Sequence, residues 1–367
     1  MKTRLSRPTN RIAAALQPFV DRHALAGAVT LVATKDEILD VTAVGFADIA
    51  ARKPMQPDGA FWIASTTKPM TGTALMMLVD EGRVSVNDPI TKYLPEFGSP
   101  MVIAEQSKQH TLLRRVTEPI RLRHLLTHTS GLPFRSGLET PTMDQHPLHT
   151  RVQSYALLPL QSKPGTKYLY SNAGINIAAR ILEIVTGQSY ADFMATRLFQ
   201  PLGLTETTFW PSPAQVRRLP HAYRPDAAKT GLEKTTIAQL HYPLPDRRRH
   251  SMPAGGLFST ARDVARFGQM ILNHGTLGGR RYLSKTAVAQ MTRKQTGPKV
   301  TTAYGFGWGT GKGWCGHGGA LANNFVVDWR HGLVMVFMVQ HAGFPGDGGQ
   351  SFETFKQAAL QLRCRRK

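Results

Sequence analysis

Hydrophobic positions near the N-terminus follow two spacings, one typical of strands and one typical of helices. Residues 28–33 and 38–44 are short apolar runs separated by the polar residues 35–37, which predicts a β-hairpin. Residues 65–80 are rich in Ala, Leu and Met and end at Gly82, which predicts a helix with a glycine after its last turn. A shorter amphipathic helix precedes the hairpin, with apolar residues at Ile12, Leu16, Phe19 and Val20.

The last third of the chain mixes the same two patterns. Runs of strand length occur at 304–308, 325–328 and 333–339. Thr260 precedes a helical stripe and is followed three residues later by Asp263, which resembles a capping box. A final helix is predicted from apolar residues at Phe352, Phe355, Ala359 and Leu362.

The middle of the chain is different, because residues 88–245 show helical segments separated by loops rich in Pro and Gly. One apolar helical stripe stops at Gly187, and Ser189 caps the segment 190–199 that follows. We therefore predict an α/β (α+β) protein with an antiparallel sheet built from both ends of the chain, flanked by helices, and an inserted all-helical domain. Residues 1–85 and 250–367 would form the sheet domain, and residues 86–249 the inserted, mainly helical domain.

Composition and charge exclude several classes of protein. The 367 residues are 41% hydrophobic and 19% charged, which excludes a disordered chain. The longest apolar run, 333–339, is far shorter than the roughly 18 residues of a membrane span. The net charge of +21 suggests a nucleic-acid partner, but the basic residues are dispersed and cluster only at 247–249 and 363–367. We expect a solvated basic surface and no nucleic-acid partner.

The sequence gives no sign of a metal or cofactor. Cys315 and Cys364 form neither a ligand cluster nor a disulfide framework. His124 and His128 are one helical turn apart, but no third ligand is evident. We expect no metal ion and no cofactor.

The first residues bear on the compartment. Residues 1–7 are basic, but residues 12–20 contain Gln and Pro and lack the apolar core of a signal peptide. We expect a cytoplasmic protein as the chain stands, or a periplasmic or secreted one if a leader was removed.

Ser65 and Lys68 form the only Ser-x-x-Lys in the chain, where a strand-like segment enters a helix. Residues three apart share a helix face, so the Lys68 amine can lie beside the Ser65 hydroxyl. Serine needs a nearby base to act as a nucleophile at neutral pH. The helix N-terminus disfavours an ammonium ion and favours developing negative charge. Alone, the motif is weak, because about one is expected by chance in such a chain.

A Tyr-x-Asn, again the only one in the chain, lies at Tyr170 and Asn172. Tyr170 could relay a proton to or from the Ser65 oxygen, provided that the neighbouring Lys68 charge lowers its pKa from about 10. Asn172 offers an amide for a substrate carbonyl. Taken alone, a plain turn before a helix explains the motif equally well.

His317, Gly318 and Gly319 follow a glycine-rich run and precede a strand. Glycines in a strand mark close approach of a backbone or a ligand. The Ala320 N–H could then bind an oxyanion together with the Ser65 N–H. A literal Lys-Thr-Gly at 229–231 lies in a polar segment without strand pattern, so we assign it to a surface loop.

The three motifs, in this order, resemble the serine β-lactamase and penicillin-binding-protein superfamily, whose signature is Ser-x-x-Lys, Tyr-x-Asn and Lys-Thr-Gly. The chain is most similar to the class C side of that superfamily, which includes D-alanyl-D-alanine carboxypeptidases, D-aminopeptidases and family VIII carboxylesterases. Residues 124–132, 164–172 and 255–260 extend the resemblance, which covers about residues 10–362. It implies the sheet-and-helix fold above and a serine hydrolase that acts through a Ser65 acyl-enzyme.

This sequence departs from the pattern in the third motif. His317 replaces Lys and Gly318 replaces Thr, which weakens the recognition of a substrate carboxylate. Family VIII esterases tolerate Gly-Gly here, so the resemblance favours hydrolysis of small carboxylic esters. A mostly neutral His317 supports a tyrosinate poorly, which favours Lys68 as the base and Tyr170 as the proton relay.

Two alternatives and two further residues stay open. The same site could serve a β-lactamase, a D-alanyl-D-alanine carboxypeptidase, or a D-amino-acid amidase or peptidase. A non-catalytic binding or sensor domain is the other alternative, and the intact motifs argue against it. Phe134 and Arg135 follow the turn at Gly131 and would line the cleft. The expected partner is a small ester or amide substrate, and the sequence leaves the oligomeric state open.

Overall fold

The computed structural model describes residues 10–364 of the chain. The basic stretch at residues 1–7 and the side chains of the basic cluster at 363–367 lie outside the described part. The residues that the sequence singles out for catalysis and binding all lie within it.

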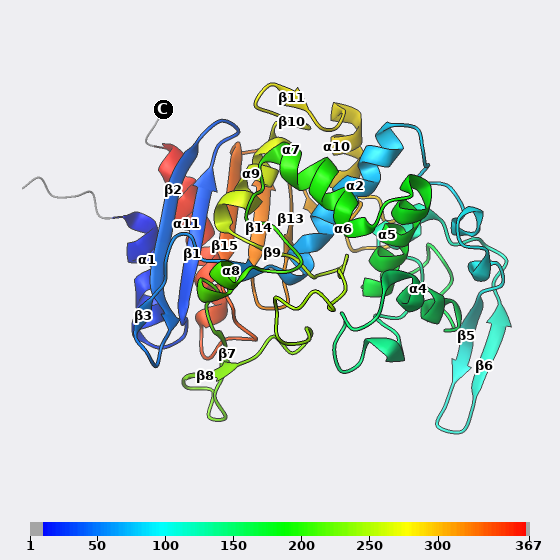
Figure 1. Ribbon diagram of the computed structural model, residues 1–367, viewed down its shortest axis with the longest axis horizontal. Coiled ribbons are helices and arrows are strands. Elements are labelled where there is room, and N and C mark those ends of the chain that lie inside the picture. Colours follow the sequence, from blue (N-terminus) through cyan, green and yellow to red (C-terminus); the bar gives the residue numbers. More distant parts are fainter. Residues whose placement is uncertain (1–9, 365–367) are drawn as a thin grey trace, which may run out of the picture.

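A seven-stranded antiparallel sheet forms the centre of the protein, as the sequence predicts (Figure 1). Its strands come from both ends of the chain, because β15 of the C-terminal third pairs with β1, with Val29 opposite Met338. In sheet order the strands are β12 (Gly309–Gly311), β13 (Trp314–Gly318), β14 (Asn324–Asp328), β15 (Leu333–Met338), β1 (Gly27–Ala33), β2 (Ile38–Asp48) and β3 (Lys53–Pro54).

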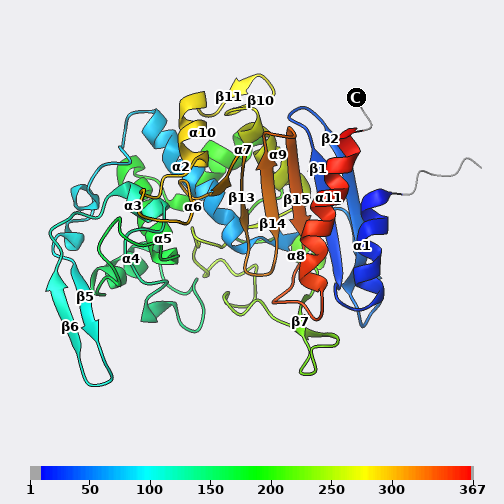
Figure 2. The ribbon, with the colours of Figure 1, turned by 180° about the vertical axis from the view of Figure 1, so that it is seen from behind.

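Helices cover both faces of this sheet. Side chains alternate along β1, so Val29 and Leu31 join the main core while Ala28 and Val32 join a second core on the other face. The main core contains α2 (Thr67–Asp80) and α9 (Ala261–Leu272), whose N-cap Thr260 accepts a hydrogen bond from the Asp263 N–H. The second core contains α1 (Arg11–Asp21) and α11 (Ser351–Cys364), which lie side by side in Figure 2.

The middle of the chain contains helices, together with two hairpins that the sequence reading did not predict. The hairpins are β5 (Met101–Gln106) with β6 (Thr111–Arg115), and β7 (Ala222–Pro225) with β8 (Leu232–Thr235). All side chains of β6 are exposed, so that strand has no buried face to leave an alternating pattern. The helices here are α3 (Leu122–Leu126), α4 (Leu148–Ala156), α5 (Asn172–Thr186), α6 (Tyr190–Phe193), α7 (Gln200–Leu202) and α8 (Pro213–Arg217).

Further short elements complete the described part. A π-helical stretch over Met194–Phe199 joins α6 to α7, so the predicted segment 190–199 is continuous helix of two kinds. The remaining elements are α10 (Lys285–Thr292), the pair β4 (Phe61–Trp62) and β9 (Phe258–Ser259), and the pair β10 (Thr276–Leu277) and β11 (Arg280–Arg281).

The strand predicted at 304–308 is wrong, because this segment is a loop packed against α2. Gly307 has a φ of +83°, and a Cβ placed on Gly72 of α2 would lie 2.2 Å from the Phe306 oxygen. The Phe306 and Gly307 N–H groups donate to the carbonyls of Met291 and Leu126 instead of to a strand. The glycines therefore serve close packing beside α2, and β12 begins only at Gly309.

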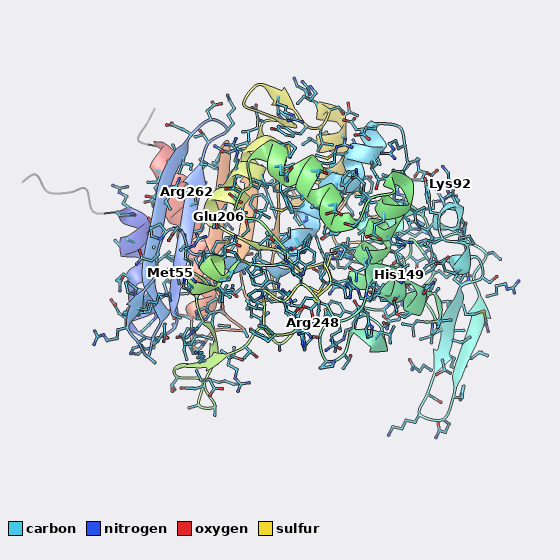
Figure 3. All side chains as sticks on the ribbon, viewed as in Figure 1. Met55, Lys92, His149, Glu206, Arg248 and Arg262 are labelled. Atoms are coloured by element: carbon cyan, nitrogen blue, oxygen red, sulfur yellow. The ribbon has the colours of Figure 1, made fainter. Side chains whose placement is uncertain are left out.

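The basic run at 247–249 does not form a continuous surface patch. Arg248, which is labelled in Figure 3, is exposed and pairs with Asp246 (2.6 Å). Arg249 is buried and pairs with the buried Asp144 at 2.7 Å. Adjacent arginines therefore have different roles, one on the surface and one inside. Among residues 10–364, no helix is long and apolar enough to cross a membrane.

Candidate active site

Ser65 lies where the small β4–β9 pair meets the first turn of α2. Trp62 of β4 pairs with Phe258 of β9, and a 3₁₀ turn over Ala64–Thr66 leads directly into the helix. Ala64 has a φ of +45°, a region that non-glycine residues rarely occupy and that is typical of constrained functional sites. This turn leaves Ser65 half-buried, whereas its neighbours are buried.

Lys68 is fully buried one turn further along α2, and its Nζ has three partners. It lies 3.0 Å from Ser65 Oγ, 2.8 Å from Asn172 Oδ1 and 2.6 Å from the Ala254 oxygen. Burial lowers the pKa of Lys68 well below its usual value. A neutral amine has two N–H groups for the amide and carbonyl oxygens, and its lone pair then accepts the Ser65 O–H. This is the arrangement of a general base beside a hydroxyl nucleophile.

Tyr170 also contacts Ser65 through a hydrogen bond, and the Lys68 Nζ lies 4.7 Å from its ring centre. The expected lowering of its pKa is wrong in direction: burial raises the pKa of Tyr170 above its usual value. The phenol therefore stays protonated at neutral pH and can donate a proton, but it is not a ready base. The sequence predicts that the Asn172 amide binds a substrate carbonyl. In the structure, its Oδ1 accepts a hydrogen bond from Lys68 Nζ and its Nδ2 lies 3.6 Å from Met143 Sδ.

His128 is a residue whose role the sequence reading missed, because it was considered only as half of a metal pair. Its carbonyl accepts the Leu169 N–H (2.8 Å) and its Nδ1 accepts the Ser171 N–H (3.2 Å). Its buried ring lies 4.4 Å from the Tyr170 ring and 4.8 Å from the Tyr304 ring, measured between centroids. His128 thus holds the segment that carries Tyr170 at two points. The φ of His128 is +56°, and the spacing of hydrophobic residues along the sequence does not predict such a local turn.

The third motif lies at a free edge of the sheet. β12 pairs only with residues 314–316 of β13, so His317 and Gly318 have no strand beyond them. A Cβ on Gly319 would lie 2.6 Å from the Ile63 oxygen, so glycine lets this edge approach the Ser65 turn. Within residues 10–364, neither the Ser65 N–H nor the Ala320 N–H has a protein acceptor. Both are therefore available for an oxyanion.

His317 is held in one neutral form. Its Nδ1 lies 2.7 Å from the Gly318 carbonyl oxygen, so Nδ1 carries the proton. Its Nε2 then accepts the Tyr304 O–H at 2.8 Å. Burial of the ring lowers the pKa of His317 below its usual value. The ring therefore brings no positive charge to the edge at neutral pH.

Phe134 and Arg135, the two residues predicted to line the cleft, make different contacts. Phe134 is 41% exposed, and its ring stacks beside the Tyr170 ring at 6.3 Å between centroids. Arg135 is exposed and donates a hydrogen bond to the backbone oxygen of Glu139 (3.2 Å). The Lys-Thr-Gly at 229–231 lies in the connection of the β7–β8 hairpin, with residues 227–230 exposed.

His124 and His128, the possible metal pair, do not lie on one helix. α3 ends at Leu126, so His128 lies outside the helix, and His124 Nδ1 accepts the Arg121 N–H. Burial lowers the pKa of His124 to about 4. In the part of the chain that the structure describes, no three His, Cys, Asp or Glu side chains are placed to hold a metal ion.

Comparison with known proteins decides the family. The family model described as Beta-lactamase matches residues 12–358. The chain belongs to the Beta-lactamase family. This family assignment agrees with the resemblance expected from the three motifs. Its members close to this chain include hydrolases named as esterases, penicillin-binding proteins and a D-alanyl-D-alanine carboxypeptidase/endopeptidase.

Three similar proteins show how far this Beta-lactamase family member resembles others. Protein Rv1367c of Mycobacterium tuberculosis is 34% identical over 286 residues, covering 76% of this chain and 70% of that protein. Esterase EstB of Burkholderia gladioli is 30% identical over 329 residues, covering 82% and 78%. Among solved structures, EstCE1, a hydrolase with promiscuous acyltransferase activity, superposes with a TM-score of 0.79, 22% identity and coverage of 95% and 97%. That last likeness shows a shared fold.

Proposed function

We propose that this protein hydrolyses small carboxylic esters through an acyl-enzyme on Ser65. The carrying observation is the buried Lys68 amine, whose Nζ lies 3.0 Å from Ser65 Oγ and has two further oxygen partners, Asn172 Oδ1 and the Ala254 carbonyl. The name of one similar protein, Esterase EstB, supports an ester substrate.

In the proposed reaction, Lys68 takes the Ser65 proton as Oγ attacks the ester carbonyl. The N–H groups of Ser65 and Ala320 bind the oxyanion of the tetrahedral intermediate. Tyr170 then gives its phenolic proton to the leaving alcohol oxygen and takes the proton held by Lys68. Water hydrolyses the acyl-enzyme by the reverse relay, which regenerates Ser65 and releases the acid.

The third motif favours esters over β-lactams. Gly318 has no hydroxyl and His317 is neutral, so both contacts that a substrate carboxylate would use are absent from this edge. A lost hydrogen bond to a charged group is worth about 1.5–3 kcal/mol. Esters without a carboxylate lose nothing by this change. The alternative functions on the same site are those of a β-lactamase, a D-alanyl-D-alanine carboxypeptidase or a D-amino-acid amidase, which the names of other relatives support.

A comparison of kcat/KM for p-nitrophenyl butyrate and for nitrocefin tests the substrate class. We expect the ester to react far faster. The double variant His317→Lys/Gly318→Thr should narrow the difference by raising nitrocefin turnover. A Cβ at Gly318 has room, because its nearest neighbours are the movable Asn324 side chain at 3.1 Å and the Asn323 oxygen at 3.6 Å. If the unaltered enzyme hydrolyses nitrocefin as fast as the ester, the alternative functions replace the proposal.

A further inference from the structure

A cavity of about 550 Å³ begins beside the candidate catalytic residues and continues over the edge of the sheet. Its inner end is lined by Tyr170, Tyr304 and His317, and its outer end by Val326 of β14 and Phe352 of α11. We call this space the outer cavity. None of the steps proposed above makes use of its outer end.

The alternation of side chains along β13 explains why the outer cavity exists. Cys315 is buried in the main core, so Trp314, Gly316 and Gly318 face the opposite side of the sheet. Gly316 and Gly318 leave part of this face of β13 without side chains. Gly316 has no room for one, because a Cβ would lie 2.2 Å from the Phe325 oxygen. In Figure 2, α11 lies on the side of β15 that is away from β14. β13 and β14 face the viewer without a helix in front of them.

The outer cavity is apolar and aromatic rather than charged. Tyr168, Tyr304, Trp314 and Phe352 form its aromatic lining, together with the aliphatic side chain of Val326. The charged side chains at its rim already have partners: Lys356 pairs with Glu353 at 2.5 Å, and Asp328 pairs with His331 at 2.7 Å. Such a lining fits a flat apolar group better than an anion.

We propose that the outer cavity holds the alcohol part of the substrate, so that the enzyme prefers esters of bulky aromatic alcohols with a small acyl group. This inference rests on the proposed function. Tyr170 both contacts Ser65 and lines the cavity. When the Ser65 Oγ–carbonyl bond forms and the carbonyl–alkoxy bond breaks, the proton from Tyr170 goes to the alkoxy oxygen. The alcohol part attached to that oxygen therefore lies on the Tyr170 side, where the cavity opens.

The test compares 2-naphthyl acetate with phenyl acetate in the intact enzyme and in Val326→Trp, which fills the outer cavity. We expect the ratio of kcat/KM for the naphthyl ester to that for the phenyl ester to fall roughly ten- to hundredfold in the variant, the usual effect of losing a pocket for apolar groups. The ratio for p-nitrophenyl butyrate to p-nitrophenyl acetate should stay unchanged, because the acyl chain lies elsewhere. Leu157→Trp, at an 85% exposed position of the inserted region, serves as the control.

The outcomes separate the two proposals. An unchanged naphthyl-to-phenyl ratio in Val326→Trp overturns the outer-cavity inference, and so does a fall in the butyrate-to-acetate ratio. Ala303→Phe fills the cavity from the opposite loop and replaces Val326→Trp if that variant fails to fold. A failure of the proposed function itself would appear differently: Ser65→Ala would then hydrolyse phenyl acetate at the full rate.

Discussion

Lys68 shows how the protonation state of a single buried group can be inferred from its partners. Burial lowers its pKa, and none of the three partners that the described residues give its Nζ is a carboxylate. Its two oxygen partners, Asn172 Oδ1 and the Ala254 carbonyl, can be satisfied by a neutral amine. A neutral amine can remove the Ser65 proton, and an ammonium ion cannot.

Lys68→Ala should reduce kcat by roughly 10²–10⁴, the usual contribution of a general base. Lys68→Arg should be equally slow, because a guanidinium keeps its proton at all working pH values. In the intact enzyme, kcat/KM should fall as pH decreases through the lowered pKa of Lys68, since protonation removes the lone pair. Steady-state kinetics of the two variants, and of the intact enzyme as a function of pH, measure these effects. Near-normal turnover by Lys68→Arg would contradict the neutral-base account.

His128 acts on the same site through Tyr170, as a positioning residue. His128→Leu removes the acceptor for the Ser171 N–H and should lower kcat about fivefold, since a hydrogen bond is worth about 1 kcal/mol. KM should change little. His128→Asn keeps an acceptor near the Nδ1 position and should recover part of kcat. A merely structural role would lower thermal stability in both variants without this split, and unchanged kcat in His128→Leu would exclude the positioning role.

At the scale of elements, the site depends on the edge of β13 lying close to the turn before α2. Glycine permits this contact at Gly319, next to Ala320, whose N–H has no protein acceptor among residues 10–364. The loop at Gly307 packs on α2 in a similar way, with a Cβ position only 2.7 Å from the Lys68 oxygen. Small residues at these two places therefore set the spacing of the catalytic elements.

Gly319→Ala should separate the β13 edge from the Ile63 carbonyl and weaken the oxyanion site. We expect kcat to fall by roughly 10²-fold, comparable to the loss of one oxyanion donor, while the fold is retained. Gly349→Ala, where an added Cβ meets nothing within 4 Å, is the matched control. Kinetics with circular dichroism of both variants make the comparison. Full activity in Gly319→Ala would show that this close approach is not needed.

At the scale of the whole molecule, buried ion pairs connect segments far apart in the sequence. Arg249 and Asp144 are separated by 105 positions, and both are buried. Asp144 also accepts the His241 N–H, and its carbonyl accepts the His250 N–H. The pair therefore ties the segment around residue 144 to the segment that returns toward the sheet. Nearby, Met143 contacts Asn172 of the active site.

Arg249→Met should destabilise the protein by about 3–5 kcal/mol, because it leaves a buried carboxylate without a partner. Arg249→Met/Asp144→Asn should recover part of that loss, since the charge is then removed. Arg248→Met is the control on the exposed neighbouring pair and should leave the unfolding midpoint unchanged. Urea unfolding gives these values. Equal effects for Arg249→Met and Arg248→Met would contradict the assigned role of the buried pair.

The extent to which the sequence predicts this molecule depends on how a segment is buried. The strands β1 and β15 are predicted because their apolar runs are buried in the sheet. β2 is predicted as well, although most of its residues are only partly buried. β6 is missed because Leu112 and Leu113 are exposed. The loop at 304–308 is misread because its backbone packs against α2 instead of pairing with a strand of the sheet. The structure brings Ser65, Lys68 and Tyr170 together, but their catalytic roles and the division into domains at residues 85 and 250 stay predictions.

The central claim is that Ser65 is the nucleophile, and labelling with a fluorophosphonate tests it most directly. The intact enzyme and Ser65→Ala are incubated with the reagent, and the mass of each whole chain is measured. We predict one adduct on the intact enzyme, located at residue 65 by peptide mapping, and none on folded Ser65→Ala. An adduct of equal yield on Ser65→Ala, or none on the active intact enzyme, would contradict the account.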